Sequence, residues 1–121
     1  MGNTPPSDPQ AAAEVFYDGG CPLCRREIAA YQRLPGLEGT VWTDVDTTAT
    51  LPEALDRDAA LARFHIRRHD GRITSGARAF LAVWRGVPRL RWLAVALDRR
   101  PFVDVAELAY RGFLKLRPLW R

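Results

Sequence analysis

The stretch that decides the fold is EVFYDGGCPLC, residues 14–24. Residues 14–17 are bulky and mostly apolar, as in a β-strand, and the Asp-Gly-Gly run at 18–20 is typical of a turn. Pro22 suits the first position of a helix, where its missing N–H group costs no hydrogen bond. The stretch therefore predicts a strand, a turn and a helix that begins at Cys21.

Cys21 and Cys24 are the only cysteines in the chain. A disulfide between them would close a short loop and add little stability, which leaves redox chemistry or metal binding as the reason for the pair. At the start of a helix, unpaired backbone N–H groups and the helix dipole favour the thiolate of Cys21. Cys24 lies one turn later on an apolar stripe with Ile28 and Tyr31. We therefore expect an exposed, attacking Cys21 and a shielded, resolving Cys24.

Asp18 lies three residues before Cys21, at the mouth of the predicted turn. A buried carboxylate in this position could take the proton of Cys24 as a general base. Aspartate is also common in turns because its side chain accepts hydrogen bonds from nearby backbone N–H groups. Its position alone slightly favours the role in the turn.

The rest of the chain predicts one further strand, one hairpin and several helices. The expected elements of the first part are a strand at 40–43, a helix from a capping box at Thr50 and Glu53 to Arg63 with a break near Arg57, and a hairpin at 64–75 around Asp70-Gly71. Three helices should follow: one from 75 or 76 to 84, one from Leu90 with Arg99 and Arg100 in its last turn, and one that carries Ala106, Ala109, Tyr110 and Phe113 on one face. This order predicts an α/β, thioredoxin-like fold, in which helices flank a small central sheet and an extra helical segment ends the chain.

The composition is that of one globular domain. The chain has 121 residues, of which 47% are hydrophobic and 26% charged, and its net charge is +4. Residues 1–13, rich in proline and small polar residues, predict a disordered tail before a single domain at 14–121. The chain has no run of 18 apolar residues and no apolar stretch of a secretory signal, so we expect a cytoplasmic protein.

The motif at 17–27, YDGGCPLCRRE, resembles the opening of the DCC family of thiol–disulfide oxidoreductases, named for an Asp-Cys-Cys signature. The resemblance continues at 41–46, 65–80, Trp92-Leu93 and Tyr110. It implies a thioredoxin-like fold, a redox-active dithiol that needs no cofactor, and Asp18, Cys21 and Cys24 as the catalytic set. Protein or small-molecule thiols and disulfides would be the substrates.

One departure from thioredoxins concerns the segment before the predicted strand at Phe64. Thioredoxins place a cis-proline there, opposite the dithiol, whereas residues 61–63 of this chain are Leu-Ala-Arg. Docking of a peptide in the thioredoxin manner is therefore not implied. A small thiol substrate and one dedicated partner protein are equally compatible with the sequence.

Two other functions compete with redox exchange. Cys21, Cys24, His65 and His69 could bind zinc, but zinc fingers bring their histidines within about 12–15 residues of the cysteines, and these lie much further along. The arginine-rich second half could bind nucleic acid or an anionic membrane through Trp84, Trp92 and Trp120. Because these aromatic residues follow helical core spacing, we expect a packed core with a solvated basic face and no nucleic-acid partner. We also expect no metal, because the histidines lie too far along the chain from the cysteines.

Overall fold

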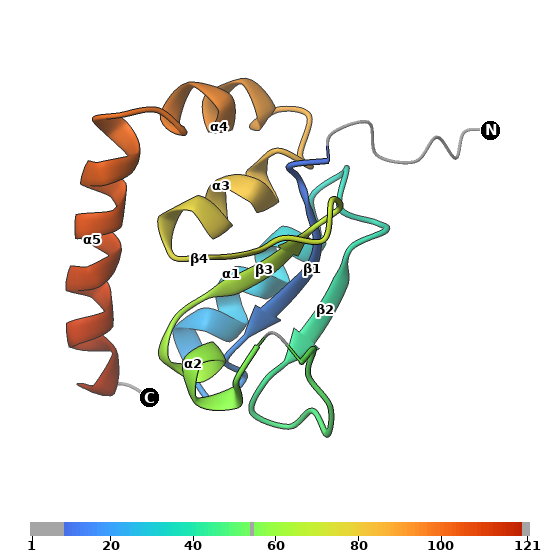
Figure 1. Cartoon of the computed structure of the whole chain (residues 1–121), viewed down its shortest axis with the longest axis vertical. Helices are drawn as coiled ribbons and strands as arrows, with labels where there is room; N and C mark the ends of the chain where they lie inside the picture. The colour runs from blue at the N-terminus through green and yellow to red at the C-terminus, as the bar shows by residue number, and fades with distance from the viewer. Residues whose placement is uncertain (1–8, 54, 120–121) are drawn as a thin grey trace.

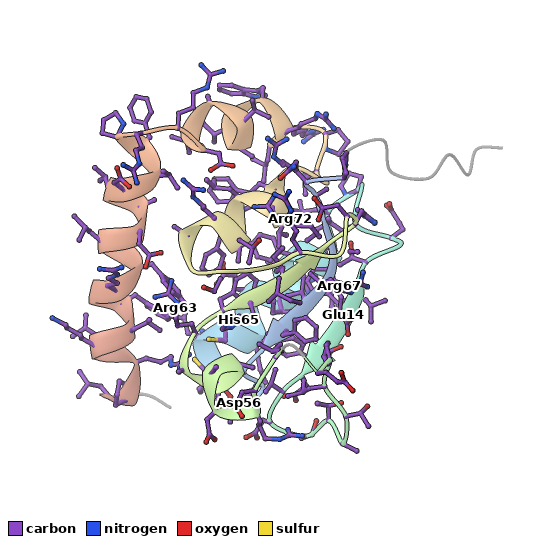
Figure 2. All side chains as sticks on the ribbon, in the orientation of Figure 1. Glu14, Asp56, Arg63, His65, Arg67 and Arg72 are labelled. Carbon is purple, nitrogen blue, oxygen red and sulfur yellow. The ribbon has the colours of Figure 1, made fainter. Side chains whose placement is uncertain are left out.

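A computed structural model describes residues 9–53 and 55–119, which form a four-stranded sheet with helices on both faces (Figure 1). The strands are β1 (Ala12–Tyr17), β2 (Val41–Asp44), β3 (His65–Arg68) and β4 (Ile73–Ser75), in the order β2-β1-β3-β4. β1 runs parallel to β2 and antiparallel to β3, which pairs antiparallel with β4 across the predicted turn. The expected strand at the start of the motif is therefore central in the sheet. Figure 2 shows Glu14 of β1 and Arg67 of β3 as neighbours, and their side chains form an ion pair of 3.6 Å.

The helices are α1 (Pro22–Gln32), α2 (Arg57–Ala62), α3 (Ala77–Trp84), α4 (Arg91–Leu97) and α5 (Phe102–Leu116), followed by a short 3₁₀ helix, η1 (Arg117–Leu119). In Figure 1, α5 runs along one side of the molecule, and its C-terminal end lies near α2. The model confirms the predicted α/β class, with a small sheet flanked by helices and an additional helical segment at the C-terminus.

Alternate side chains of β1 serve two separate cores, because neighbouring residues of a strand point to opposite faces. Val15 is fully buried among apolar residues of α1, α3 and β3, such as Ile28 and Val83. Phe16 is fully buried on the opposite face of the sheet, in a second core that includes Ala60 of α2. β1 is thus held on both faces, and the turn that follows it has a rigid base.

The domain begins earlier than predicted. β1 starts at Ala12, and Ala11, Ala12 and Ala13 are all buried. The His69 N–H donates to the Ala11 carbonyl at 3.0 Å, so the backbone of this segment is bonded to the end of the hairpin. The predicted boundary between residues 13 and 14 therefore falls inside β1, which pairs with β3 from Ala12 onward. Residues 1–8 of the predicted tail lie outside the described residues.

Three helix predictions also need correction. α2 begins at Arg57, where Asp56 caps it by accepting the Ala59 N–H at 3.2 Å, so the pattern at 50–53 does not start the helix. Arg57 instead donates to the carbonyls of Val45 and Thr48, which holds the preceding loop against the sheet. α4 ends at Leu97, before the two arginines that were expected in its last turn, and the side chain of Ala109 in α5 is exposed.

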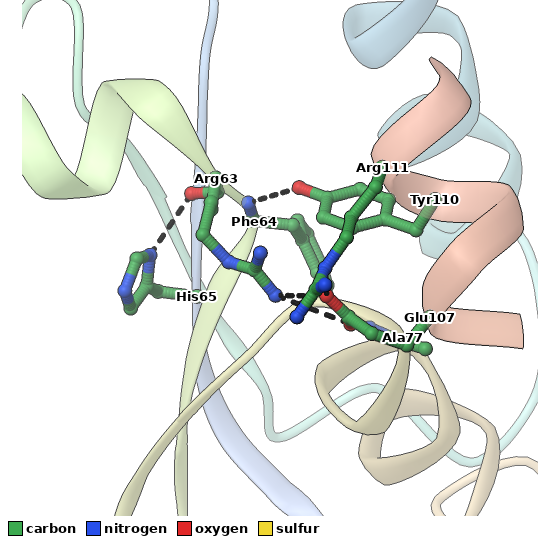
Figure 3. A network of polar contacts seen from close by, with 7 residues as sticks. All are labelled: Arg63, Phe64, His65, Ala77, Glu107, Tyr110 and Arg111. Atoms are coloured by element: carbon green, nitrogen blue, oxygen red, sulfur yellow. Dashed lines mark hydrogen bonds and ion pairs between the residues drawn. The ribbon is translucent and has the colours of Figure 1, made fainter. Parts of the chain in front are cut away.

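Hydrogen bonds and an ion pair connect α5 to the segment before β3 and to the start of α3 (Figure 3). The Phe64 N–H donates to the hydroxyl of buried Tyr110. The carboxylate of Glu107 accepts the Ala77 N–H at 3.1 Å and a hydrogen bond of 2.9 Å from Arg63. Because the N-cap of α3 is a glycine without a side-chain acceptor, Glu107 supplies the missing cap from another helix.

We expect Tyr110→Phe to lower the free energy of unfolding by about 1–3 kcal/mol, because it leaves the Phe64 N–H without an acceptor in a buried place. Urea denaturation followed by circular dichroism measures the change. Tyr17→Phe is the matched control, since the hydroxyl of half-buried Tyr17 bonds to no residue in the described part of the chain. Equal losses in the two variants would contradict the role of this hydrogen bond.

Candidate functional site

The turn between β1 and α1 is built around Asp18. Its carbonyl accepts the Cys21 N–H at 3.1 Å, and its carboxylate accepts the Gly20 N–H at 2.9 Å. The side chain is 4% exposed, so this carboxylate is buried beside the dithiol. The bonding expected of a turn aspartate is therefore present, and the burial that a general base would need is present as well.

Two further side chains brace the same turn. Asp44, at the end of β2, accepts the Gly19 N–H at 2.9 Å, and Arg25 of α1 donates to the Gly19 carbonyl at 2.7 Å. A Cβ atom at position 19 would collide with the Asp44 carboxylate, so a larger residue there would displace Asp44 from its bond to the turn. The sequence offers Asp44 only as one of several acidic residues after a strand, and the parallel pairing of β1 with β2 is what brings it to the turn.

Cys21 is the N-cap of α1, with extended backbone angles (φ −98°, ψ 116°) and Pro22 at the first helical position. Its Sγ atom accepts the Cys24 backbone N–H at 3.4 Å. The sulfur thus takes the place that an oxygen fills in an ordinary helix cap, and a negative charge on it would be stabilised there. The predicted position of Cys21 at the helix start is confirmed, and both cysteines are free thiols.

The predicted exposures of the two thiols are wrong. Cys21 is 0% exposed, whereas Cys24 is partly exposed. The side chain of Cys21 lies against the first turn of α1, where its Sγ atom accepts the Cys24 N–H, and none of it reaches the surface. Ile28 and Tyr31, which share a face of α1 with Cys24, are buried as predicted. Cys24 lies in the first turn of this face and is only partly covered.

The surroundings of Cys24 disfavour its thiolate. Burial raises the pKa of Cys24 from 9.0 to about 12, and the hydrogen bond and charge of Cys21 and the charge of Asp18 act in the same direction. The guanidinium of Arg117 opposes them and lowers the pKa of Cys24. Cys24 therefore keeps its proton while a negative charge resides on Cys21.

Arg117 is a site residue that sequence reasoning missed. It lies in η1, far along the chain from the motif, and its Nη2 group donates to the Leu61 carbonyl just before β3. This bond fixes its guanidinium where it acts on Cys24. No signal in the sequence distinguishes it from the other arginines of the second half, because the fold alone brings the C-terminal segment to the dithiol.

The segment that precedes β3 uses its backbone groups within the chain. The Phe64 N–H donates to Tyr110, and the Arg63 carbonyl contacts His65 Nδ1 at 2.9 Å (Figure 3). The Leu61 carbonyl accepts from Arg117. In thioredoxins a cis-proline occupies this segment. Here, two residues of the C-terminal helices take its polar groups.

The histidines do not join the cysteines. His65 lies on β3 with its ring against the Arg63 carbonyl, and His69 is exposed beside the hairpin turn. Across residues 9–53 and 55–119, no group of three or more histidine, cysteine or acidic side chains is placed to hold a metal ion. The zinc alternative therefore lacks a ligand set in this part of the chain.

The tryptophans of the second half have different environments. Trp84 is half-buried, and its Nε1–H donates to the Tyr31 hydroxyl at 3.0 Å. Trp92 is 70% exposed, so the expectation that it belongs to the core is wrong. Trp120 lies outside the described residues.

Within the described residues, no helix is both long and apolar enough to cross a membrane.

Comparisons with known proteins identify the family. Residues 15–121 match the family model of the DCC1-like thiol-disulfide oxidoreductases. A protein of Arabidopsis thaliana, named only as uncharacterized and chloroplastic, is 28% identical over 108 residues, which cover 86% of this chain and 50% of that relative. The chain thus spans about half the length of this relative, and the cytoplasmic location expected above stays a prediction. No solved structure matches the chain. With a family match over nearly the whole domain and both cysteines at the start of α1, the chain belongs to the DCC1-like thiol-disulfide oxidoreductase family.

Proposed function

We propose that the protein catalyses thiol–disulfide exchange, with Cys21 as the attacking and Cys24 as the resolving thiol. The observation that carries this proposal is the place of the Cys21 sulfur at the N-cap of α1, where it accepts a backbone N–H group. Cys21 Sγ receives a backbone N–H group at a helix start, whereas the pKa of Cys24 is raised to about 12. Since the thiolate is the nucleophile, Cys21 attacks first although it is the more buried sulfur.

The proposed reaction transfers two electrons from the dithiol to a substrate disulfide. The Cys21 thiolate attacks one sulfur of the substrate, the substrate S–S bond breaks, and one substrate thiolate leaves. Cys24 then loses its proton and attacks Cys21, which releases the second substrate thiol and forms the Cys21–Cys24 disulfide. The reverse sequence oxidises a substrate dithiol.

Asp18 is the proposed proton acceptor for Cys24. Its carboxylate is buried, and its charge raises the pKa of Cys24, which supports a position close to that thiol. Once Cys21 is held in a mixed disulfide it carries no charge, so one of the causes of the high Cys24 pKa disappears at this step. Proton transfer to Asp18 and the positive charge of Arg117 then favour the second attack.

The arrangement supports a low-molecular-weight disulfide as substrate rather than an extended peptide. The backbone groups of the segment before β3 already bond to Tyr110 and Arg117, so a peptide would have to displace both. Cys21 is also fully covered, and a small disulfide needs a smaller opening than a protein surface does.

Redox titration of the purified protein tests the proposal. In glutathione buffers of graded potential, we expect a two-electron couple between about −270 and −120 mV, the range of known redox-active dithiols of this kind. Thiol quantification by alkylation and mass spectrometry follows the reaction, and Cys21→Ser is the control that cannot form the disulfide. If Cys21 and Cys24 never pair within this range, the proposed function is wrong.

A further inference from the structure

Helix α4 is apolar on both of its sides. On the inward side, Ala94 is fully buried in a core that it shares with residues of α3 and α5. On the outward side, Trp92 is 70% exposed and Ala96 is exposed as well. The run at 92–97, WLAVAL, has no polar group apart from the indole N–H, whereas a helix at the surface of a protein normally presents polar side chains to water. The outward side of α4 therefore has the composition of a surface that a partner covers.

The apolar surface continues from α4 onto the start of α5. Trp92 lines an open hollow of about 690 Å³ whose other apolar walls include Pro88, Val95 and Phe102. Phe102 is itself exposed, and exposed Val105 follows it by about one turn on the same side of α5. Contiguous exposed apolar surface of this kind marks a site of interaction.

Arginines flank this apolar surface at both ends of α4. Arg91 and Arg99 line the hollow, and Arg89 and Arg100 lie next to them in the chain. All four residues are exposed. A partner that covers the apolar centre therefore meets positive charge on both sides, which favours an anionic partner.

Acidic groups offset little of this charge. Between residues 88 and 103 the sequence has one acidic residue, Asp98, whose half-buried carboxylate pairs with Arg78 of α3 at 3.8 Å. Asp104 is exposed and forms an ion pair of 3.6 Å with Arg100. With four arginines and one exposed carboxylate, the surface remains positive.

We propose that this α4 surface, formed by Trp92, Ala96, Phe102 and the four arginines, binds an anionic lipid membrane. The two aromatic side chains would enter the boundary between headgroups and acyl chains, and the arginines would meet the lipid phosphates. The centre of the surface offers hardly any directional hydrogen-bonding group, which a specific protein or RNA partner would need. A bilayer needs only an apolar centre between cations, and this is the chemistry that the surface presents.

Docking through α4 would leave the dithiol facing away from the membrane. In Figure 1, α4 and α2 lie at opposite ends of the molecule, and β1 runs away from α4 toward the turn that leads into α1. Binding does not rest on the proposed redox function and involves no covalent step. A protein without exchange activity could therefore still bind the membrane, and a redox-active protein could fail to bind it.

Sedimentation of the full chain with lipid vesicles tests the proposal. We expect binding to phosphatidylcholine vesicles that contain about 30% phosphatidylglycerol to be at least about tenfold tighter than binding to phosphatidylcholine alone, since each arginine near an anionic surface adds about fivefold in affinity. Salt at about 0.5 M should weaken the binding, because it screens the charges of the arginines and the lipids.

Two variants remove the two parts of the interaction. Trp92→Ala should lower the affinity for the anionic vesicles at least about tenfold, because it removes an apolar side chain that the membrane would cover. Arg89→Gln combined with Arg99→Gln should lower it by about 25-fold. The three side chains are exposed, and thermal unfolding verifies that both variants fold.

The matched controls change the same kinds of residue away from α4. Leu23→Ala removes an exposed apolar side chain from the first turn of α1, and Arg26→Gln with Lys115→Gln removes two exposed charges from α1 and the last part of α5. Both controls should bind nearly as the wild type does.

The proposal is overturned if the wild type does not bind the anionic vesicles, or binds neutral vesicles equally well. It is equally overturned if the two variants of the α4 surface fold and bind as well as the controls. Binding of single-stranded RNA or polyglutamate without binding of vesicles would also overturn it, since the surface would then recognise another class of polyanion.

Discussion

Replacing Cys24 with serine is expected to stop exchange after the first step and leave a stable mixed disulfide on Cys21. The serine hydroxyl is not acidic enough to attack a disulfide, whereas the Cys21 thiolate at the helix start is unaffected. Cys21→Ser should instead be almost inert. Burial raises the pKa of the Cys24 thiol, so it is ionised far less than an ordinary cysteine at neutral pH, and loss of Cys21 removes only part of the causes.

Mass spectrometry after exposure to 2-hydroxyethyl disulfide measures the difference. Cys24→Ser should gain the mass of one mercaptoethanol adduct, wild type should lose two protons and gain no adduct, and Cys21→Ser should stay largely unmodified. Serine is nearly isosteric with cysteine, so comparable thermal stability of both variants is the control for folding. Because Cys24 is the more exposed sulfur, a reversed result, with the adduct on Cys24 in the Cys21→Ser variant, would exchange the proposed roles.

Asp18→Asn is expected to slow resolution of the mixed disulfide by about a hundredfold or more, the usual contribution of a general base. The first attack should change little, because it depends on the Cys21 thiolate. Electrostatics alone predicts the opposite sign. The charge of Asp18 raises the pKa of Cys24, so its removal would make more Cys24 thiolate and accelerate resolution unless the carboxylate also takes the proton.

The pH dependence separates the two effects. Without a base, resolution requires a Cys24 thiolate formed by solvent, and its rate should rise about tenfold per pH unit up to the pKa of Cys24. Stopped-flow measurement of Asp18→Asn should show this slope between pH 7 and 9, whereas wild type should be flatter. Asparagine keeps an oxygen that can accept the Gly20 N–H, so the turn is retained.

The matched control is Asp46→Asn, which changes an exposed carboxylate near the same turn. It should leave both steps as in wild type. Equal resolution rates in Asp18→Asn and wild type, with equal stability, would assign Asp18 to the turn alone, and a faster rate in Asp18→Asn would show that its charge only hinders Cys24.

Features that depend on neighbouring residues could be predicted from the sequence. The order of apolar strand, Asp-Gly-Gly turn and helix-opening proline was sufficient to place Cys21 at the N-cap of α1. The turn at Asp70-Gly71 was equally readable, since Gly71 adopts a positive φ of 95° there. In these places the backbone conformation follows from local sterics and hydrogen bonds, so a short stretch of sequence carries the information.

Which sulfur is covered, and which distant groups act on the dithiol, could not be predicted from the sequence. The burial of Cys21, the exposure of Cys24 and the effect of Arg117 all depend on contacts between segments far apart in the chain. The early start of β1 has the same origin, because its backbone pairs with the end of the hairpin. The late start of α2 is a local effect, since Asp56 accepts the Ala59 N–H and caps the helix there. Burial and electrostatics are properties of the space around a residue, and that space exists only once the sheet, α5 and η1 have come together.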